Sequence, residues 1–68
     1  MRGVHYYYYS EFQRKLNDFD PSAGQEFAVL SSTHSPREIF LWLEQRRVNG
    51  LLPSTLEPLV TDFYWEIS

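Results

Sequence analysis

The segment 31–35, Ser-Ser-Thr-His-Ser, is the one place where this sequence sets hydroxyl groups beside an imidazole. Nucleophilic catalysis needs such a hydroxyl next to a base that a third group orients, and G-x-S-x-G is a typical local mark. No such mark occurs, and Ser35 suits a helix cap. We therefore expect His34 to be an exposed or capping residue, and we expect no enzyme activity.

Metal and cofactor chemistry has even less support. The histidines, His5 and His34, lie far apart, there is no cysteine, and spacings such as H-E-x-x-H are absent, so no metal site is expected. The three glycines are isolated, whereas a phosphate cradle needs a glycine-rich loop that enters a helix. We predict no bound cofactor.

Charge and hydropathy narrow the partners. Nine acidic against six basic residues leave a net charge of −3 with no basic stripe, which makes nucleic acid an unlikely partner. The longest apolar run, 39–43, is far shorter than the ~18–20 residues that cross a bilayer, so no membrane span is expected. The lack of cysteine fits a reducing compartment and a cytoplasmic location. Whether residues 1–3 are native or an expression leader is left open.

A chain of 68 residues allows one small domain, 1–68, with a single core. Without disulfides or a metal, it must rely on large side chains or on oligomerisation. Aromatic residues make up 18% of the sequence, and each can bury about 150–250 Å². The elements that position these aromatics therefore decide what the protein can do.

The clearest element is a helix at about 36–48. Ser35 and Glu38 fit a capping box, Pro36 falls at the first helical position, and Gly50 follows the C-terminal end. On this helix Leu41 and Val48 project away from the core face. They form a second apolar strip, which either the following loop covers or a partner does.

Two other segments have weaker helical signals. Residues 10–19 form either a short second helix or one arm of a hairpin. Residues 54–60 resemble a third capping box, but Pro58 removes a backbone donor, so we expect one helical turn at most.

Three segments have the composition or alternation of strands: 4–9, 27–30 and 61–68. They predict an α+β fold of two layers, a three-stranded sheet packed on the 36–48 helix. The predicted core is Phe27, Val29, Ile39, Phe40, Trp42, Leu43, Phe63, Trp65 and Ile67.

The tyrosines give the functional prediction. On strands, Tyr7, Tyr9 and Tyr64 would point outward and merge into one patch on the sheet, provided that the terminal strands are neighbours. Tyrosine anchors protein interfaces because it offers a large contact area with few rotors. The predicted binding residues are Tyr7, Tyr9, Tyr64, Leu41 and Val48.

Two functions follow from this arrangement, with self-association as a third possibility. The first is a non-catalytic protein-interaction module, such as an inhibitor or adaptor. The alternative is a single-stranded nucleic-acid binder in which tyrosines stack bases while Arg14, Lys15, Arg46 and Arg47 hold phosphates. The strand, strand, helix, strand order with a Ser-Pro-x-Glu helix start resembles the general layout of small phage-encoded inhibitors of host enzymes. That resemblance implies an inhibitor-like role and assigns no residues.

Overall fold

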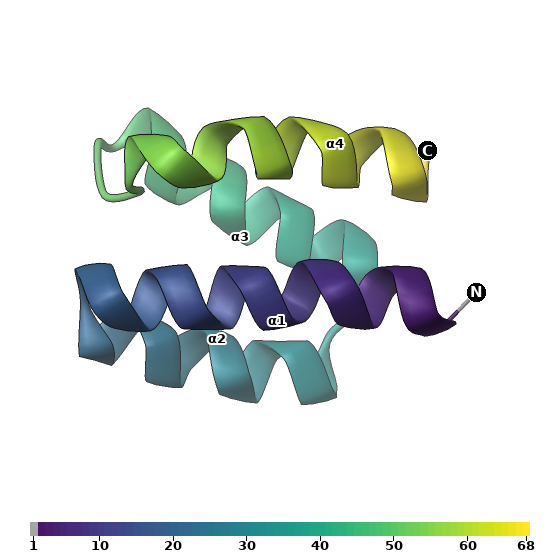
Figure 1. Ribbon diagram of the computed structural model, residues 1–68, viewed down its shortest axis with the longest axis horizontal. Coiled ribbons are helices and arrows are strands. Elements are labelled where there is room, and N and C mark those ends of the chain that lie inside the picture. Colours follow the sequence, from purple (N-terminus) through teal and green to yellow (C-terminus); the bar gives the residue numbers. More distant parts are fainter. Residues whose placement is uncertain (1) are drawn as a thin grey trace.

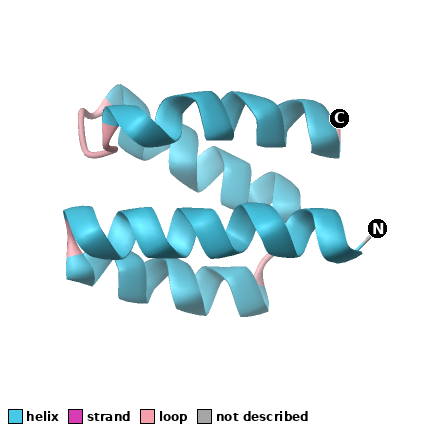
Figure 2. Ribbon diagram, viewed as in Figure 1, coloured by secondary structure: helices cyan, strands magenta, loops and turns pink. Residues whose placement is uncertain are grey.

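Four α-helices make up the fold, in a computed structural model that describes the backbone of residues 2–68 and the side chains of residues 7–68. Short loops join consecutive helices (Figure 1). No strand occurs among residues 2–68 (Figure 2). The elements are α1 (Arg2–Phe19), α2 (Pro21–Thr33), α3 (Pro36–Val48), a 3₁₀ turn η1 (Ser54–Leu56) and α4 (Glu57–Ile67).

The predicted α+β class, with a three-stranded sheet on one main helix, is therefore wrong. The expected strands 4–9, 27–30 and 61–68 are parts of α1, α2 and α4. Strand propensity is a weak preference that packing overrides, and the buried positions recur at helical spacing, as in Phe12 and Leu16 on α1. The resemblance to phage-encoded inhibitors depended on the strand order and no longer holds.

The helix predicted at 36–48 is confirmed as α3. Its capping box is complete: the Glu38 backbone N–H donates to Ser35 Oγ at 3.4 Å, and the Ser35 N–H donates to Glu38 Oε1 at 3.1 Å. After the helix, Gly50 has a φ of +71°, a conformation that glycine adopts without strain. Local signals at both ends therefore fix this helix.

The other two uncertain segments are also helical. Residues 10–19 are helical, so the hairpin alternative is wrong. They are the second half of α1 rather than a separate short helix, because α1 begins at Arg2. The prediction of one turn at most for 54–60 is wrong, because α4 continues to Ile67. Pro58 is tolerated since it lies in the first turn of α4, where a backbone N–H has no intrahelical partner to lose.

Helices α1 and α2 approach each other closely at Gly24. A Cβ atom placed on Gly24 would lie 2.7 Å from Asn17 Oδ1 and 2.9 Å from Asn17 Cα, so no larger residue fits without movement. Gln13 Nε2 donates a hydrogen bond to the Gly24 carbonyl at 2.6 Å. Ala23, with only a methyl group, and Gly24, with no side chain, are both buried and thus allow a tight antiparallel contact.

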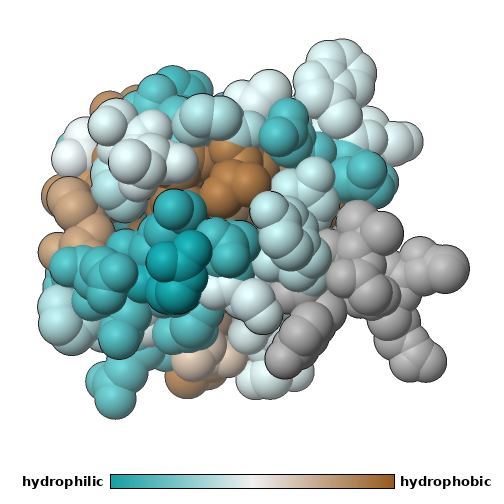
Figure 3. All heavy atoms as spheres, viewed as in Figure 1, coloured by the Kyte–Doolittle hydropathy of each residue, from teal (hydrophilic) through white to brown (hydrophobic). Residues whose placement is uncertain are grey.

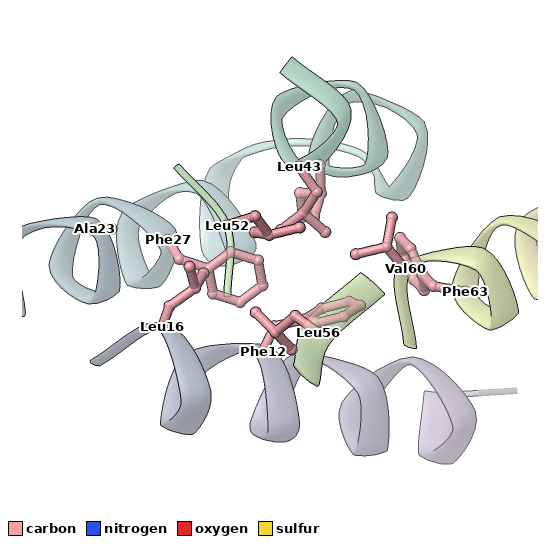
Figure 4. Packing of buried hydrophobic residues seen from close by; sticks show 10 residues of the cluster. Phe12, Leu16, Ala23, Phe27, Leu43, Leu52, Leu56, Val60 and Phe63 are labelled. Atoms are coloured by element: carbon pink, nitrogen blue, oxygen red, sulfur yellow. The ribbon is translucent and has the colours of Figure 1, made fainter. Parts of the chain in front are cut away.

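Side chains from all four helices meet in one apolar cluster (Figure 4). The prediction that Val29 and Trp65 belong to the core is wrong, because they are 62% and 70% exposed. Phe40, Trp42 and Ile67 are half-buried at the edge of the apolar cluster. The buried residues are Phe12, Leu16, Ala23, Phe27, Ile39, Leu43, Leu52, Leu56, Val60 and Phe63.

Candidate functional site

The hydroxyls of segment 31–35 cap and terminate helices. Thr33 Oγ1 lies 2.8 Å from the Val29 carbonyl and 2.8 Å from His34 Nδ1, at the exposed end of α2. Ser35 belongs to the capping box of α3. Among residues 7–68, no side chain other than Thr33 forms a hydrogen bond or ion pair with His34 that could orient it as the third member of a triad.

The described part of the chain has neither a metal-binding cluster nor a membrane-spanning helix. Residues 7–68 contain no group of three or more His, Cys, Asp or Glu side chains that could hold a metal ion. None of the described helices combines the length and hydropathy that crossing a membrane requires. His5, whose side chain lies outside the described residues, is not placed.

An open groove runs between α3 and α4. Near its middle the rings of Phe40 and Tyr64 contact each other, with centroids 5.0 Å apart and planes at 41°. On one side of this contact the groove opens between Glu44 and Val60, with a volume of about 480 Å³. On the other side it continues past Ile67 toward the start of α3. The helices are thus held apart by two large rings, and a hollow is left along their outer surface.

Exposed apolar side chains form the rims of this groove. Leu41 is 59% exposed on α3, and Val48 lies seven residues later, two turns along the same side. On α4, Trp65 projects into solvent with its ring edge-on to Tyr64, at a centroid distance of 5.4 Å. The loop after α3 covers neither Leu41 nor Val48. We define the α3–α4 face as Arg37, Phe40, Leu41, Glu44, Arg47, Val48, Glu57, Tyr64, Trp65 and Ile67.

The charges of the α3–α4 face differ between its two ends. At one end the Arg47 guanidinium donates a hydrogen bond to the Glu44 carboxylate. That hydrogen bond, together with the negative charges of Glu44 and then of Glu57, raises the pKa of Arg47 above its ordinary value. Glu57 itself forms no ion pair with a described residue. At the other end stands Arg37, likewise without an ion pair to residues 7–68. One end therefore carries two carboxylates against one guanidinium. The other carries the Arg37 guanidinium, with Glu66 of α4 lining the same hollow but forming no ion pair with it.

The opposite side of α3 is closed against α2. Trp42 Nε1 donates to Glu26 Oε2 at 3.3 Å, and its ring packs on Phe27 with centroids 5.9 Å apart. The Arg46 guanidinium lies 5.2 Å from the Trp42 ring centroid and 3.9 Å from Asp20 Oδ2. These contacts occupy one side of α3, so its free side is the one that faces the groove.

The structure separates the five predicted binding residues. Tyr7 is 57% exposed on α1, whereas Tyr9 is half-buried and contacts Phe27 and Phe63 at 5.9 and 5.8 Å. Two residues apart on a helix, Tyr7 and Tyr9 point about 200° apart. The expected sheet patch of three tyrosines therefore does not form. Leu41 and Tyr64 line the same part of the α3–α4 groove, and Val48 lies two turns from Leu41 on the same side of α3.

Sequence reasoning missed part of this face. It assigned Phe40 and Trp65 to the core and gave no binding role to Arg37 or Glu57. A helical projection of 57–67 would have placed Trp65 about 200° from Phe63, and hence outward. The signal was present, but the segment was interpreted as a strand.

The side of the molecule formed by α1 and α4 is mostly polar. In Figure 3 hydrophilic side chains cover much of α1, and a narrow apolar strip shows between the two helices. No protein-family model, curated protein or solved structure matches the chain. The candidate site therefore stands on the geometry of the α3–α4 face.

Proposed function

We propose that this protein is a non-catalytic protein-binding module and that the α3–α4 face is its docking surface. The observation that carries the proposal is the pair of exposed apolar rims, Leu41 and Trp65, on either side of the Phe40 and Tyr64 rings. Contiguous exposed apolar surface on a small domain marks interaction sites. An inhibitor or adaptor role would need only such a surface.

The side chains on this face suit protein recognition. Trp65 and Tyr64 are of the types that dominate binding energy at interfaces, because each buries a large area for few frozen rotors. Arg37 and Glu57 stand at the ends, where a polar rim surrounds an apolar centre. A helix or a second helical pair laid along the groove would meet apolar side chains in its middle and charges at its ends.

The alternative, single-stranded nucleic acid, receives less support. Of the four cations predicted to hold phosphates, Arg14, Arg46 and Arg47 each pair with a carboxylate. Binding a phosphate there would require breaking an ion pair, and only Lys15 remains. A titration with labelled oligonucleotides at low ionic strength should give no saturable binding. Saturable, salt-sensitive binding would favour the nucleic-acid function instead.

A cytoplasmic location is part of the same proposal. The sequence contains no cysteine, which is compatible with a reducing compartment. Fractionation of the native host's cells with an antibody to the chain tests this directly.

Site-specific photo-crosslinking tests the docking surface. Benzoylphenylalanine is placed at position 41, on the face, or at position 29 as a matched control on α2. Both native side chains are about equally exposed, at 59% for Leu41 and 62% for Val29, so neither change should disturb the core. Irradiation in cells of the native host should give a discrete adduct from position 41 and none from position 29.

Mass spectrometry of the adduct identifies the partner. Equal labelling from positions 41 and 29 would show non-specific contact, and adducts from position 29 alone would place the docking surface on α2. Either result rejects the α3–α4 face.

A further inference from the structure

We infer that the partner that docks on the α3–α4 face is a second copy of this chain, related by a twofold axis, with Arg37 of each copy against Glu57 of the other. The inference rests on the proposed function, because it uses the same face. It adds the identity of the partner and the orientation in which it binds.

The first argument is the distribution of charge along the groove. Helices α3 and α4 run in opposite directions, so the start of α3 lies beside the end of α4 (Figure 1). Arg37 therefore marks one end of the groove and Glu57 the other. A twofold axis perpendicular to the groove exchanges these ends. Arg37 of each copy then lies against the end of the other copy that holds Glu57, so both Arg37 and Glu57 gain an ion-pair partner.

The second argument is where that axis must fall. The ring contact sets Phe40 level with Tyr64. At about 1.5 Å per residue, Arg37 then lies roughly 4.5 Å to one side of the rings and Glu57 roughly 10.5 Å to the other. The midpoint is about 3 Å from the rings, within about one residue's rise of Leu41. An exposed leucine close to a twofold axis meets its own copy.

The same placement fills the groove. The Phe40 and Tyr64 rings lie to one side of the axis. The twofold rotation therefore places the rings of one copy against the hollow beside Val60 and Thr61 of the other copy. The exchange occurs twice, once in each direction, as an isologous contact requires. Large rings thus pack where the single chain leaves open space.

The third argument is size. A stable interface buries roughly 800 Å² per partner, about a fifth of the 4471 Å² that the molecule exposes. The molecule measures 29 × 20 × 17 Å, so one long side supplies an area of that order. A chain this small, with no disulfide, is also one for which oligomerisation is a usual source of added stability.

Sedimentation equilibrium of the purified full chain tests the inference, over about 1–500 µM, a range that brackets micromolar association. The wild type should pass from monomer to dimer. Leu41→Glu sets two like charges near the axis and should raise the dissociation constant at least about tenfold. Val29→Glu, an equally exposed change on α2, should leave it unchanged. Circular dichroism melts establish that both variants fold.

A charge exchange tests the orientation. Arg37→Glu and Glu57→Lys each set like charges against each other across the interface, and each should weaken the dimer about three- to tenfold. The double variant restores the pairing with its signs reversed. It should bind within about threefold of the wild type.

Several results would overturn the inference. A wild type that stays monomeric at the highest concentration rejects the dimer, and equal weakening by Val29→Glu rejects this face. A double variant as weak as the combined single variants rejects the twofold pairing. If the chain is monomeric but position 41 still crosslinks to another protein, the proposed function stands without self-association. If neither occurs, both proposals fail.

Discussion

The two helical pairs differ in the size of the residues at their contact. Between α1 and α2, Gly24 and Ala23 let the backbones approach until a single added carbon would clash. Between α3 and α4, Phe40 and Tyr64 meet through their rings and hold the helices apart. The first pair closes its seam, whereas the second leaves a groove with exposed rims. In a fold this small, side-chain size at the helix contact decides which seam remains available to a partner.

The largest expected effect is in the core that both pairs share. Phe27 is fully buried and contacts Tyr9, Phe12 and Trp42. Phe27→Ala should therefore lower the free energy of unfolding by about 3–5 kcal/mol, measured by urea denaturation. Trp65→Ala removes a larger ring from a 70% exposed position and should change stability by less than about 0.5 kcal/mol. Similar losses for the two variants would contradict the assignment of Trp65 to the surface.

The close approach of α1 and α2 at Gly24 predicts that an alanine there destabilises the protein. Gly24→Ala should destabilise the protein by about 1–3 kcal/mol, because the new methyl meets Asn17. Helix propensity alone predicts the opposite sign, a gain of about 1 kcal/mol. Thermal and urea melts distinguish the two, with Gln25→Ala on the exposed side of α2 as the control. A more stable Gly24→Ala variant would show that the seam is looser than described.

The stability of the α3–α4 pair depends on the cap at the start of α3. Ser35→Ala removes the hydroxyl that accepts from the Glu38 backbone N–H and should cost about 1 kcal/mol of stability. Ser35→Asp keeps an acceptor at the cap and should retain most of it. If both substitutions lower the stability equally, the capping box does not stabilise α3.

The smallest effect is a pH dependence at the contact of α1 with α4. Burial, followed by the charges of Asp62 and Glu66, raises the pKa of Tyr8 above 10.0, and burial raises that of Tyr9. Because folding favours the protonated phenols, this stabilisation is present below pH 10 and is lost as the pH rises through the folded-state pKa.

Urea denaturation at about pH 8 and about pH 11 measures that loss. It should be smaller in the Tyr8→Phe, Tyr9→Phe double variant than in the wild type. An unchanged alkaline loss in the double variant would assign it to other groups.

The part of the fold that the sequence predicts correctly depends on local signals. Helix α3 has its cap at Ser35, a proline at its first position and Gly50 after its end, and all three act within a few residues. The same helical projection placed Leu41 and Val48 away from the core, and both are exposed. Where neighbours along the chain carry the information, the prediction is confirmed.

The wrong predictions concern short apolar runs whose pattern fits both the period of a strand and that of a helix. The tyrosine run suggests a strand when examined alone, but Phe12 and Leu16 continue its buried side at helical spacing. Alternation in 61–68 placed Trp65 beside Phe63, and a helix turns them apart. The α3–α4 face could not be predicted as a whole, because Tyr64 and Phe40 meet only through tertiary packing.

The left-handed residue after α3 has a consequence for chemical synthesis. Gly50 has a φ of +71°, in the left-handed region. An L-residue is strained in this conformation, whereas a D-residue adopts it as its ordinary helical state. A synthetic chain with D-alanine at position 50 should have a less flexible unfolded state and a backbone conformation that suits the D-residue, for a gain of about 0.4–1 kcal/mol. This one glycine thus marks a site where inverted chirality would strengthen the protein.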